Sequence, residues 1–272
     1  MTEAMGARRV IDFHTHAFPE KVVERAMEHL EEVYQTKAPF DGRVGTLLRH
    51  MDESGVDISV ILPVATKPSQ VESINTWAAE VQSERLVCFG ALHPDYPRPR
   101  AEIRRMRRMG LRGVKFHPNF QEFHPDDERM FPIYEALAEE GLVVLFHAGN
   151  DMRPRERVFA SPERIAKVAE RFPGLRLVAA HLGGYLMWRE AEEHLVGHPV
   201  WLDLSYVFAA LPTREVARLV RLHGPDRVLF GTDFPFARQD ETIERVRSLG
   251  LSEAELGAIL GGNAERLLFG PA

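Results

Sequence analysis

Two histidines one residue apart, His14 and His16, are the first residues in the chain whose types and spacing could do chemistry. They end a short apolar run, "VIDFHTH" at positions 10–16. Because residues i and i+2 of a β-strand face the same side, the spacing predicts that both imidazoles point into the same space. Phe13 and Thr15 are then expected to face the other way, toward a layer of helices. Two imidazoles can grip one cation, but the remaining ligands must come from elsewhere.

Other apolar runs also end in residues that could do chemistry, namely His93, Lys115, His117, His147, His181, Ser205 and Asp233. His147 and Asp233 are the natural candidates for the missing ligands. Three histidines and one carboxylate leave room for a bound water, as a catalytic metal requires. Nitrogen and oxygen donors suit zinc, manganese, iron or cobalt, and zinc is our first expectation. We read His93 and His117, each followed by proline, as structural residues at strand ends.

Short apolar runs recur along the whole chain, and their β-branched and aromatic content predicts buried strands. We expect eight strands, at 9–14, 57–64, 85–93, 112–117, 142–149, 175–184, 200–205 and 227–234. The intervals between them hold amphipathic segments that predict helices, for example 21–34, 126–140, 161–172 and 213–224.

Strand and helix alternating in this way predict an α/β fold, a (β/α)8 TIM barrel forming a single domain over residues 1–272. An open doubly wound sheet is the alternative, but the first strand lacks the glycine-rich phosphate turn typical of that fold. Two helical patterns within 17–45 predict a helical excursion between strands 1 and 2 that covers the barrel mouth. Reactive groups of such barrels lie at the C-terminal ends of the strands, where the polar residues named above fall.

Five motifs carry a resemblance to a known family: "DFHTH" (12–16), "LFHAG" (145–149), "AAHLGG" (179–184), "FGTDFPF" (230–236) and "GNAERLLF" (262–269). In this order the chain resembles the amidohydrolase superfamily. Within it, the chain is similar to the amidohydrolase-2 branch related to aminocarboxymuconate-semialdehyde decarboxylase. The resemblance implies one divalent metal held by His14, His16, His147 and Asp233. It also implies that His181 acts on the substrate or on the metal-bound water.

The expected activity is metal-dependent hydrolysis of a lactone, amide or ester bond in a small, carboxylate-bearing substrate, through a metal-activated water. Asp233 would accept the proton of that water, and His181 would orient the water or polarise the carbonyl. The alternative is non-oxidative decarboxylation, because the same branch contains decarboxylases with the same ligands. A barrel that only binds a ligand is a third class, and it ranks low because no catalytic residue of the branch is missing.

Lys115 has two interpretations. It could carry a charge at the site, by binding a substrate carboxylate or pairing with Asp233, because a buried lysine is costly unless paired. It could instead be carboxylated and bridge two metals, as in other members of the superfamily. We favour the charge role and include Lys115 among the catalytic residues. Arg153, Arg155 and Arg238, which follow predicted strands, are weaker candidates for holding an anionic substrate.

Composition excludes several other classes of protein. The net charge is −6, with 34 basic and 40 acidic residues interspersed, which disfavours a nucleic-acid surface. The basic run 98–110 has helical apolar spacing and predicts an ordinary amphipathic helix. A single cysteine, Cys88, excludes an intrachain disulfide. The sequence shows neither a membrane span nor an apolar leader at its start, so we expect a cytoplasmic enzyme with a small-molecule substrate; a homo-oligomer is compatible with it.

Overall fold

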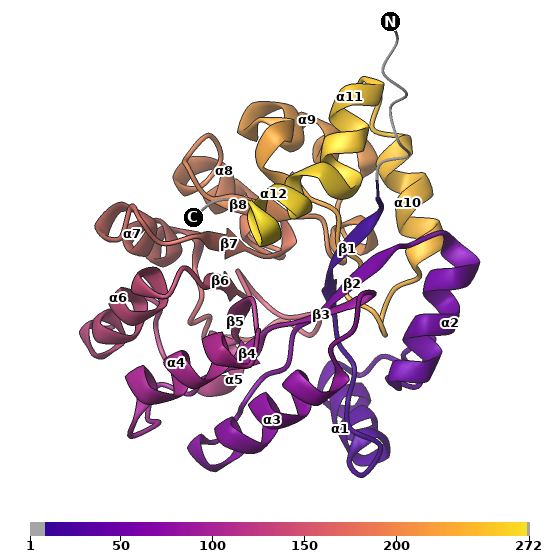
Figure 1. Ribbon diagram of the computed structural model, residues 1–272. Coiled ribbons are helices and arrows are strands. Elements are labelled where there is room, and N and C mark those ends of the chain that lie inside the picture. Colours follow the sequence, from indigo (N-terminus) through magenta and orange to yellow (C-terminus); the bar gives the residue numbers. More distant parts are fainter. Residues whose placement is uncertain (1–8, 271–272) are drawn as a thin grey trace, which may run out of the picture.

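A computed structural model describes residues 9–270, which form a ring of parallel strands surrounded by helices (Figure 1). The strands are β1 (Ile11–Thr15), β2 (Ile58–Ile61), β3 (Leu86–Cys88), β4 (Gly90–Ala91), β5 (Gly113–Phe116), β6 (Val143–Phe146), β7 (Leu177–Ala179), β8 (Trp201–Asp203) and β9 (Val228–Leu229). Each lies within a predicted run except β1, which extends one residue beyond the predicted 9–14, and the third run holds both β3 and β4. The predicted (β/α)8 barrel is therefore confirmed.

The strands pair in sequence order, β1-β2-β3 and then β4 to β9, always in parallel. Only Phe89 separates β3 from β4, and its amide donates to the Ile61 carbonyl. The ring closes where Thr15 bridges Phe234 and the Phe13 amide donates to the Phe230 carbonyl at 2.9 Å. Eight strand positions thus form one closed barrel without an open edge.

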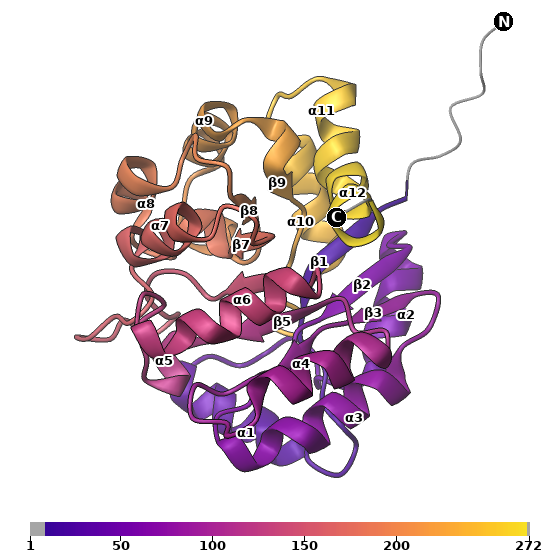
Figure 2. The same ribbon diagram turned by 60° about the vertical axis from the view of Figure 1, so that its left-hand side comes forward.

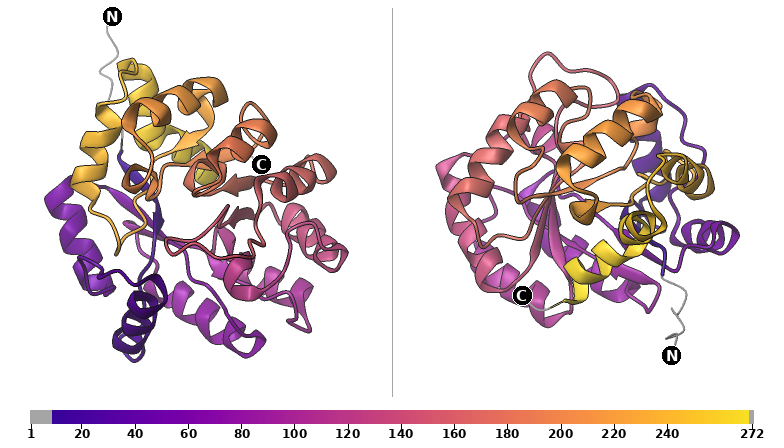
Figure 3. Two further views of the ribbon diagram at one scale, coloured as in Figure 1. Left: turned by 180° about the vertical axis from the view of Figure 1, so that it is seen from behind. Right: turned by 90° about the horizontal axis from the view of Figure 1, so that it is seen from above.

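Helices cover the outside of the barrel, as the views from behind and from above show (Figure 3). They are α1 (Val23–Tyr34), α2 (Val44–Ser54), α3 (Val71–Val81), α4 (Pro99–Arg108), α5 (Pro118–Gln121), α6 (Phe131–Glu139), α7 (Pro162–Arg171), α8 (Trp188–His194), α9 (Thr213–His223), α10 (Gln239–Arg247), α11 (Glu253–Gly257) and α12 (Asn263–Phe269). The basic run forms α4 and buries Ile103 and Met106, as its spacing predicts. Within residues 9–270, no helix combines the length and the apolar character needed to cross a lipid bilayer.

Two apolar layers stabilise this arrangement. One layer lies between strands and helices, and the other fills the barrel, where Phe13 meets Phe89 edge to face at 5.8 Å. Leu267 and Leu268 of α12 join the inner layer and close the end of the barrel opposite the strand C-termini (Figure 2). The excursion between β1 and β2 holds two helices, as expected, but only α1 lies within the predicted 17–45, and α2 begins where that range ends. Gly55 ends α2 in the left-handed region with φ 69°.

The strand carrying the two histidines departs from simple alternation, which corrects one prediction. Phe13 belongs to the inner layer and does not face the helices. Asp12 pairs with Ser59 and Thr15 with Ile61, so β1 has one residue more than β2 over this stretch. Such a β-bulge shifts the alternation by one residue. Phe13 therefore fills the barrel while His14 and His16, beyond the bulge, still face its mouth.

Candidate metal centre and active site

The residues that the sequence singled out for the metal and the chemistry meet at one end of the barrel. His14 lies in β1 and His16 directly after it, and Lys115 lies in β5. The others follow β6, β7 and β9 in turn and are His147, His181 and Asp233. All except His16 are less than one-tenth exposed. The C-terminal ends of the strands thus form one enclosed polar cluster, as the barrel fold requires of an active site.

Three of the four predicted metal ligands surround a single point. Oδ1 of Asp233 lies 3.1 Å from Nε2 of His16 and 3.5 Å from Nε2 of His14. The two imidazole planes stand at 74° to each other. Ligand atoms bound to one tetrahedral ion at about 2.1 Å are separated by about 3.4 Å, so these atoms fit a shared divalent cation.

In both His14 and His16 the Nδ1 nitrogen is held by a hydrogen bond, so that Nε2 faces this point. Nδ1 of His14 lies 2.8 Å from a carboxylate oxygen of Asp203, and Nδ1 of His16 lies 2.8 Å from the carbonyl of Leu62. Both partners only accept, so each Nδ1 carries the proton and donates it. Each Nε2 consequently turns a lone pair toward the Asp233 carboxylate.

His147 and His181 follow the same rule. Nε2 of His147 donates to the carbonyl of Asn150 at 2.9 Å, and Nδ1 of His181 donates to the carbonyl of Ser205 at 2.9 Å. Their other nitrogens, Nδ1 of His147 and Nε2 of His181, face each other at 3.0 Å. In the neutral rings, two lone pairs meet there. Together with the ring nitrogens of His14 and His16 and the carboxylate of Asp233, these nitrogens direct lone pairs into the cluster. Nitrogen and oxygen lone pairs of this kind are the ligands of a cation site.

Burial keeps the imidazoles of His14, His147 and His181 neutral, which is their metal-binding form. Burial first, and then the charge of Lys115, lowers the pKa of His14 and that of His147 to about 3. Burial and His147 together lower the pKa of His181 to about 4. These three histidines therefore offer uncharged nitrogen donors to the site.

Lys115 is the cation of the cluster. Its Nζ lies 3.1 Å from Nε2 of His14, and the side chain is 1% exposed. Burial lowers its pKa to about 8, while Asp203 and Asp233 act in the opposite direction. Within residues 9–270, Lys115 forms no ion pair, so the structure does not contain the suggested pairing with Asp233. The lysine instead donates to a predicted metal ligand.

Another group of potential ligands, His117, His147 and Asp151, lies beside this cluster. The rings of His117 and His147 are stacked, with centroids 4.1 Å apart and planes only 9° from parallel. Lone pairs lie in the ring planes, so two stacked imidazoles cannot both point at one ion. We therefore assign no metal to this group. His117, expected to be a structural residue, packs directly on a candidate ligand.

Aromatic side chains from separate segments surround the mouth. Tyr34, the last residue of α1, lies edge to face with Phe236 at 5.4 Å and next to Phe120 at 6.0 Å. On the other side Tyr185 lies 5.9 Å from His181 and 6.0 Å from Tyr206. The excursion thus covers the barrel mouth through Tyr34, as predicted.

The three tyrosines around the mouth, Tyr34, Tyr185 and Tyr206, offer hydroxyl groups to the site. Burial raises the pKa of all three, for Tyr185 to about 12, and Asp233 adds to the effect in each case. The phenols therefore remain protonated and can donate. Within residues 9–270, none of these hydroxyls has a hydrogen-bond partner.

Comparison with known proteins decides the family. The family model for amidohydrolases matches residues 11–270, nearly the whole chain. The chain belongs to the amidohydrolase family. Its predicted resemblance is thereby confirmed, and with it the expectation that this is an enzyme.

Individual relatives of this amidohydrolase refine the picture. It is 25% identical to a 2-amino-3-carboxymuconate-6-semialdehyde decarboxylase of Dictyostelium discoideum, over 95% of this chain and 91% of the relative. A dihydroorotase of Pseudomonas fluorescens is 34% identical, but over only 30% of this chain and 26% of its own length. A dihydroxybenzoic acid decarboxylase from a Polaromonas species, solved with manganese and an inhibitor, superposes with a TM-score of 0.70 and 17% identity, covering 96% and 97% of the chains. These likenesses support the decarboxylase alternative better than the predicted hydrolase.

Two residues that the structure places at the candidate site were not predicted there. Asp203, at the end of β8, is fully buried, accepts from His14, and also accepts from the amides of His181 and Ser205 at 2.9 and 3.0 Å. The sequence contains a pattern that could have identified Asp203, because it is a charged residue near the end of the apolar run 200–205. Tyr34 had no signal beyond its place in the excursion, since a tyrosine at the end of an amphipathic helix is unremarkable in sequence.

The three arginines that the sequence suggested for holding an anionic substrate differ in their position relative to the site. Arg155 lies at the site, paired with Asp151 and stacked 5.1 Å over Phe120. Arg153 is exposed. Arg238 pairs with Asp240 and lies over Phe40, away from the cluster.

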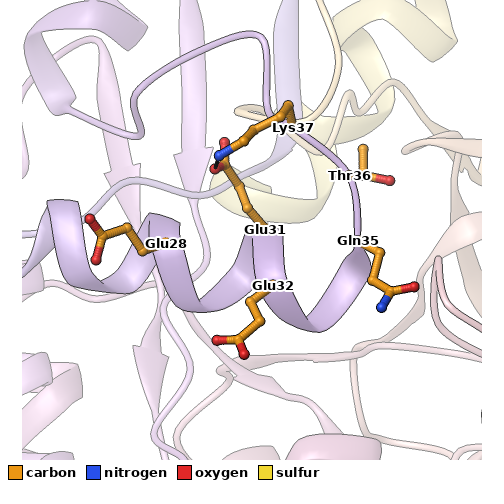
Figure 4. Close-up of a pocket in the computed structure, with 6 residues that line it drawn as sticks. All are labelled: Glu28, Glu31, Glu32, Gln35, Thr36 and Lys37. Carbon is orange, nitrogen blue, oxygen red and sulfur yellow. Dashed lines mark hydrogen bonds and ion pairs between the residues drawn. The ribbon is translucent and has the colours of Figure 1, made fainter.

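Two surface hollows are lined by residues other than the candidate metal ligands. One, of about 380 Å³, is lined by residues of α1 and of the turn after it, Glu28, Glu31, Glu32, Gln35, Thr36 and Lys37 (Figure 4). The other, of about 650 Å³, is lined by residues at the N-terminal ends of β2 and β3, among them Ile58, Arg85 and Leu86. Neither contains a predicted site residue, so neither bears on the chemistry.

Proposed function

We propose that this chain catalyses the metal-dependent, non-oxidative decarboxylation of a small carboxylic acid. The observation that carries the proposal is the extent of the likeness. A decarboxylase aligns with 95% of the chain, whereas the dihydroorotase match covers 30%. The proposal replaces hydrolysis, our first expectation from the sequence, with its alternative.

The proposed cofactor is one divalent ion held by His14, His16 and Asp233, with His147 as the fourth ligand. The convergence of Nε2 of His14 and of His16 on the Asp233 carboxylate supports the first three ligands. His147 is proposed as the fourth because its Nδ1 faces His181 with a free lone pair. When bound, the ion supplies a Lewis acid that binds substrate oxygen and stabilises negative charge. Zinc and manganese both suit the donor set, and manganese is bound in the Polaromonas relative, so both belong in the first trials.

The protein's own side chains would then bind and orient the substrate carboxylate, which is lost as CO2. We assign its positive partner to Lys115, which is buried among the ligands, and its outer contacts to the hydroxyl of Tyr34 and to Arg155. In the reaction the bond between the carboxyl carbon and its neighbour breaks, CO2 leaves, and the electron pair that remains takes up a proton. His181 would relay this proton: its Nε2 is unprotonated because Nδ1 donates to the carbonyl of Ser205, so Nε2 first takes a proton from solvent and then delivers it to the carbon.

The apolar rim supports loss of CO2 over attack by water. Phe120, Phe236 and Tyr34 pack together across the mouth, and Tyr185 covers His181. A dry, low-dielectric site favours conversion of a carboxylate into neutral CO2, whereas hydrolysis needs a water in the same space. Hydrolysis of a cyclic amide remains the competing function, favoured only by the partial dihydroorotase match.

The deciding experiment incubates metal-loaded protein with acids of the kinds that the relatives' names give. These are 2-amino-3-carboxymuconate 6-semialdehyde, dihydroxybenzoic acids and, for hydrolysis, dihydroorotate. CO2 release and ring opening are measured in parallel, with His16→Ala as the inactive control. We expect CO2 from at least one acid and no ring opening. Ring opening of dihydroorotate without CO2 from any acid would overturn the proposal.

A further inference from the structure

The β-bulge in β1 depends on a side chain for one of its hydrogen bonds. Asp12 pairs with Ser59 and Thr15 with Ile61, so the stretch between them carries an extra residue. A bulge of this kind interrupts the ladder and leaves backbone groups without a partner. Here the amide of His14 donates to Oδ1 of Asp12 at 3.2 Å. The Asp12 carboxylate thereby takes the place of the missing ladder bond.

The same carboxylate also holds the segment that carries Asp233. Oδ1 of Asp12 accepts from the amide of Thr232 at 3.0 Å, and Oδ2 accepts from the Thr232 hydroxyl at 2.7 Å. A further bond comes from the side-chain amide of Gln239 at 2.8 Å. Asp12 is fully buried, and its two oxygens together accept four hydrogen bonds. One side chain thus connects the first and the last strand of the barrel.

Asp233 needs such support because its backbone is strained. Its φ is 74°, in the left-handed region, which is unfavourable for a residue other than glycine. The amide of Asp233 donates to the carbonyl of His14 at 2.8 Å, and the amide of Phe234 donates to the Thr232 hydroxyl at 3.0 Å. The hydroxyl that Asp12 binds is therefore the one that stabilises this turn.

We propose that Asp12 is a positioning residue for the metal centre. It supports the bulge that directs His14 and His16 toward the barrel mouth, and it holds the Thr232 turn that brings Asp233 to meet them. Asp12 itself faces the α10 side of β1, toward Gln239, and touches no substrate. The inference rests on the metal site of the proposed function.

The test measures manganese and zinc affinity of the full chain by competition with a chromogenic chelator. Asp12→Ala removes all four bonds, and we expect metal affinity to fall by about 10–100-fold, the usual cost of losing an outer-shell partner. Asp12→Asn keeps Oδ1 as acceptor for the two amides. Oε1 of Gln239 has no partner within residues 9–270. If the side-chain amide of Gln239 rotates by a half-turn, the new NH2 group of the variant can donate to this oxygen. We expect this variant to restore most of the affinity.

A matched control separates positioning from general loss of stability. Asn75 is equally buried, and its hydrogen bonds go to the amide and the carbonyl of Ala91 and to Glu102, none of which is a proposed ligand. Asn75→Ala should lower the melting temperature without changing metal affinity. If Asp12→Ala does not fold, Thr232→Val, which loses only the hydroxyl, replaces it and is expected to weaken metal binding.

The possible failures are distinguishable. A parent chain that binds no ion overturns the proposed function and this inference together. A parent that binds one ion, with Asp12→Ala or Thr232→Val binding as tightly, overturns the inference alone. Asp12→Asn as weak as Asp12→Ala would also contradict it, because the role would then belong to the charge and not to the hydrogen bonds.

Discussion

Two sides of the barrel mouth are built differently. On the side of β1 and β9, His14, His16 and Asp233 converge with planes at a steep angle, and every hydrogen bond behind them fixes a lone pair inward. On the side of β6 and α1, His147 is stacked on His117, and Asp151 is bound to an arginine. The first arrangement suits one small cation, and the second suits a flat polar molecule. The comparison suggests that metal binding and substrate selection lie mainly on different sides of the mouth, which meet at His147.

The largest effect is expected on the metal side. His16→Ala removes a nitrogen that lies 3.1 Å from Asp233, and we expect it to abolish stoichiometric metal binding and to lower kcat by about a thousandfold or more, since metal catalysis supplies several kcal/mol. Elemental analysis and CO2 release measure the two effects. His29→Ala, on the exposed face of α1, is the control and should behave like the parent. Equal metal content in both variants would contradict the assignment.

A second prediction concerns the carboxylate behind His14. Asp203→Asn keeps the shape of the side chain but removes the charge that accepts the Nδ1 proton. We expect metal affinity to fall by roughly 10–100-fold while the fold is retained. Chelator competition measures the affinity, and circular dichroism checks the fold. Unchanged affinity would mean that the direction of the His14 lone pair does not depend on Asp203.

A smaller effect is expected on the substrate side. Tyr34→Phe removes a hydroxyl and leaves the packing against Phe120 and Phe236. KM should rise by roughly fivefold, the size of one hydrogen bond of about 1 kcal/mol, and metal affinity should not change. Tyr34→Ala opens the mouth as well, so kcat should also fall. If Tyr34→Phe lowered metal affinity, the separation of the two sides would be wrong.

The smallest effect distinguishes two arginines. Arg155→Ala should raise KM for an acidic substrate, because Arg155 stands at the mouth over Phe120. Arg238→Ala should leave KM unchanged, because Arg238 is paired with Asp240 outside the site. Steady-state kinetics on both variants test the pair. Equal effects would show that overall charge, rather than position, attracts the substrate.

Much of this architecture could be predicted from the sequence, because apolar runs and strand-end polar residues carry strong signals. The positions of His14, His16, Lys115, His147, His181 and Asp233 at one end of the barrel follow from the fold class alone. The orientation of Phe13 did not follow, because one extra residue in β1 shifts the alternation and no local pattern announces it. The roles proposed for Asp12 and Asp203 depend on partners far away in sequence, Thr232 and His14, so only the folded chain reveals them.

The most direct test of the account is the position of the ion itself. Crystals grown with manganese would give an anomalous difference map in which the metal can be located without reference to the protein. We predict one peak per chain, within bonding distance of Nε2 of His14, Nε2 of His16 and a carboxylate oxygen of Asp233. A peak beside Asp151 and His117, or the absence of any peak at the barrel mouth, would contradict it.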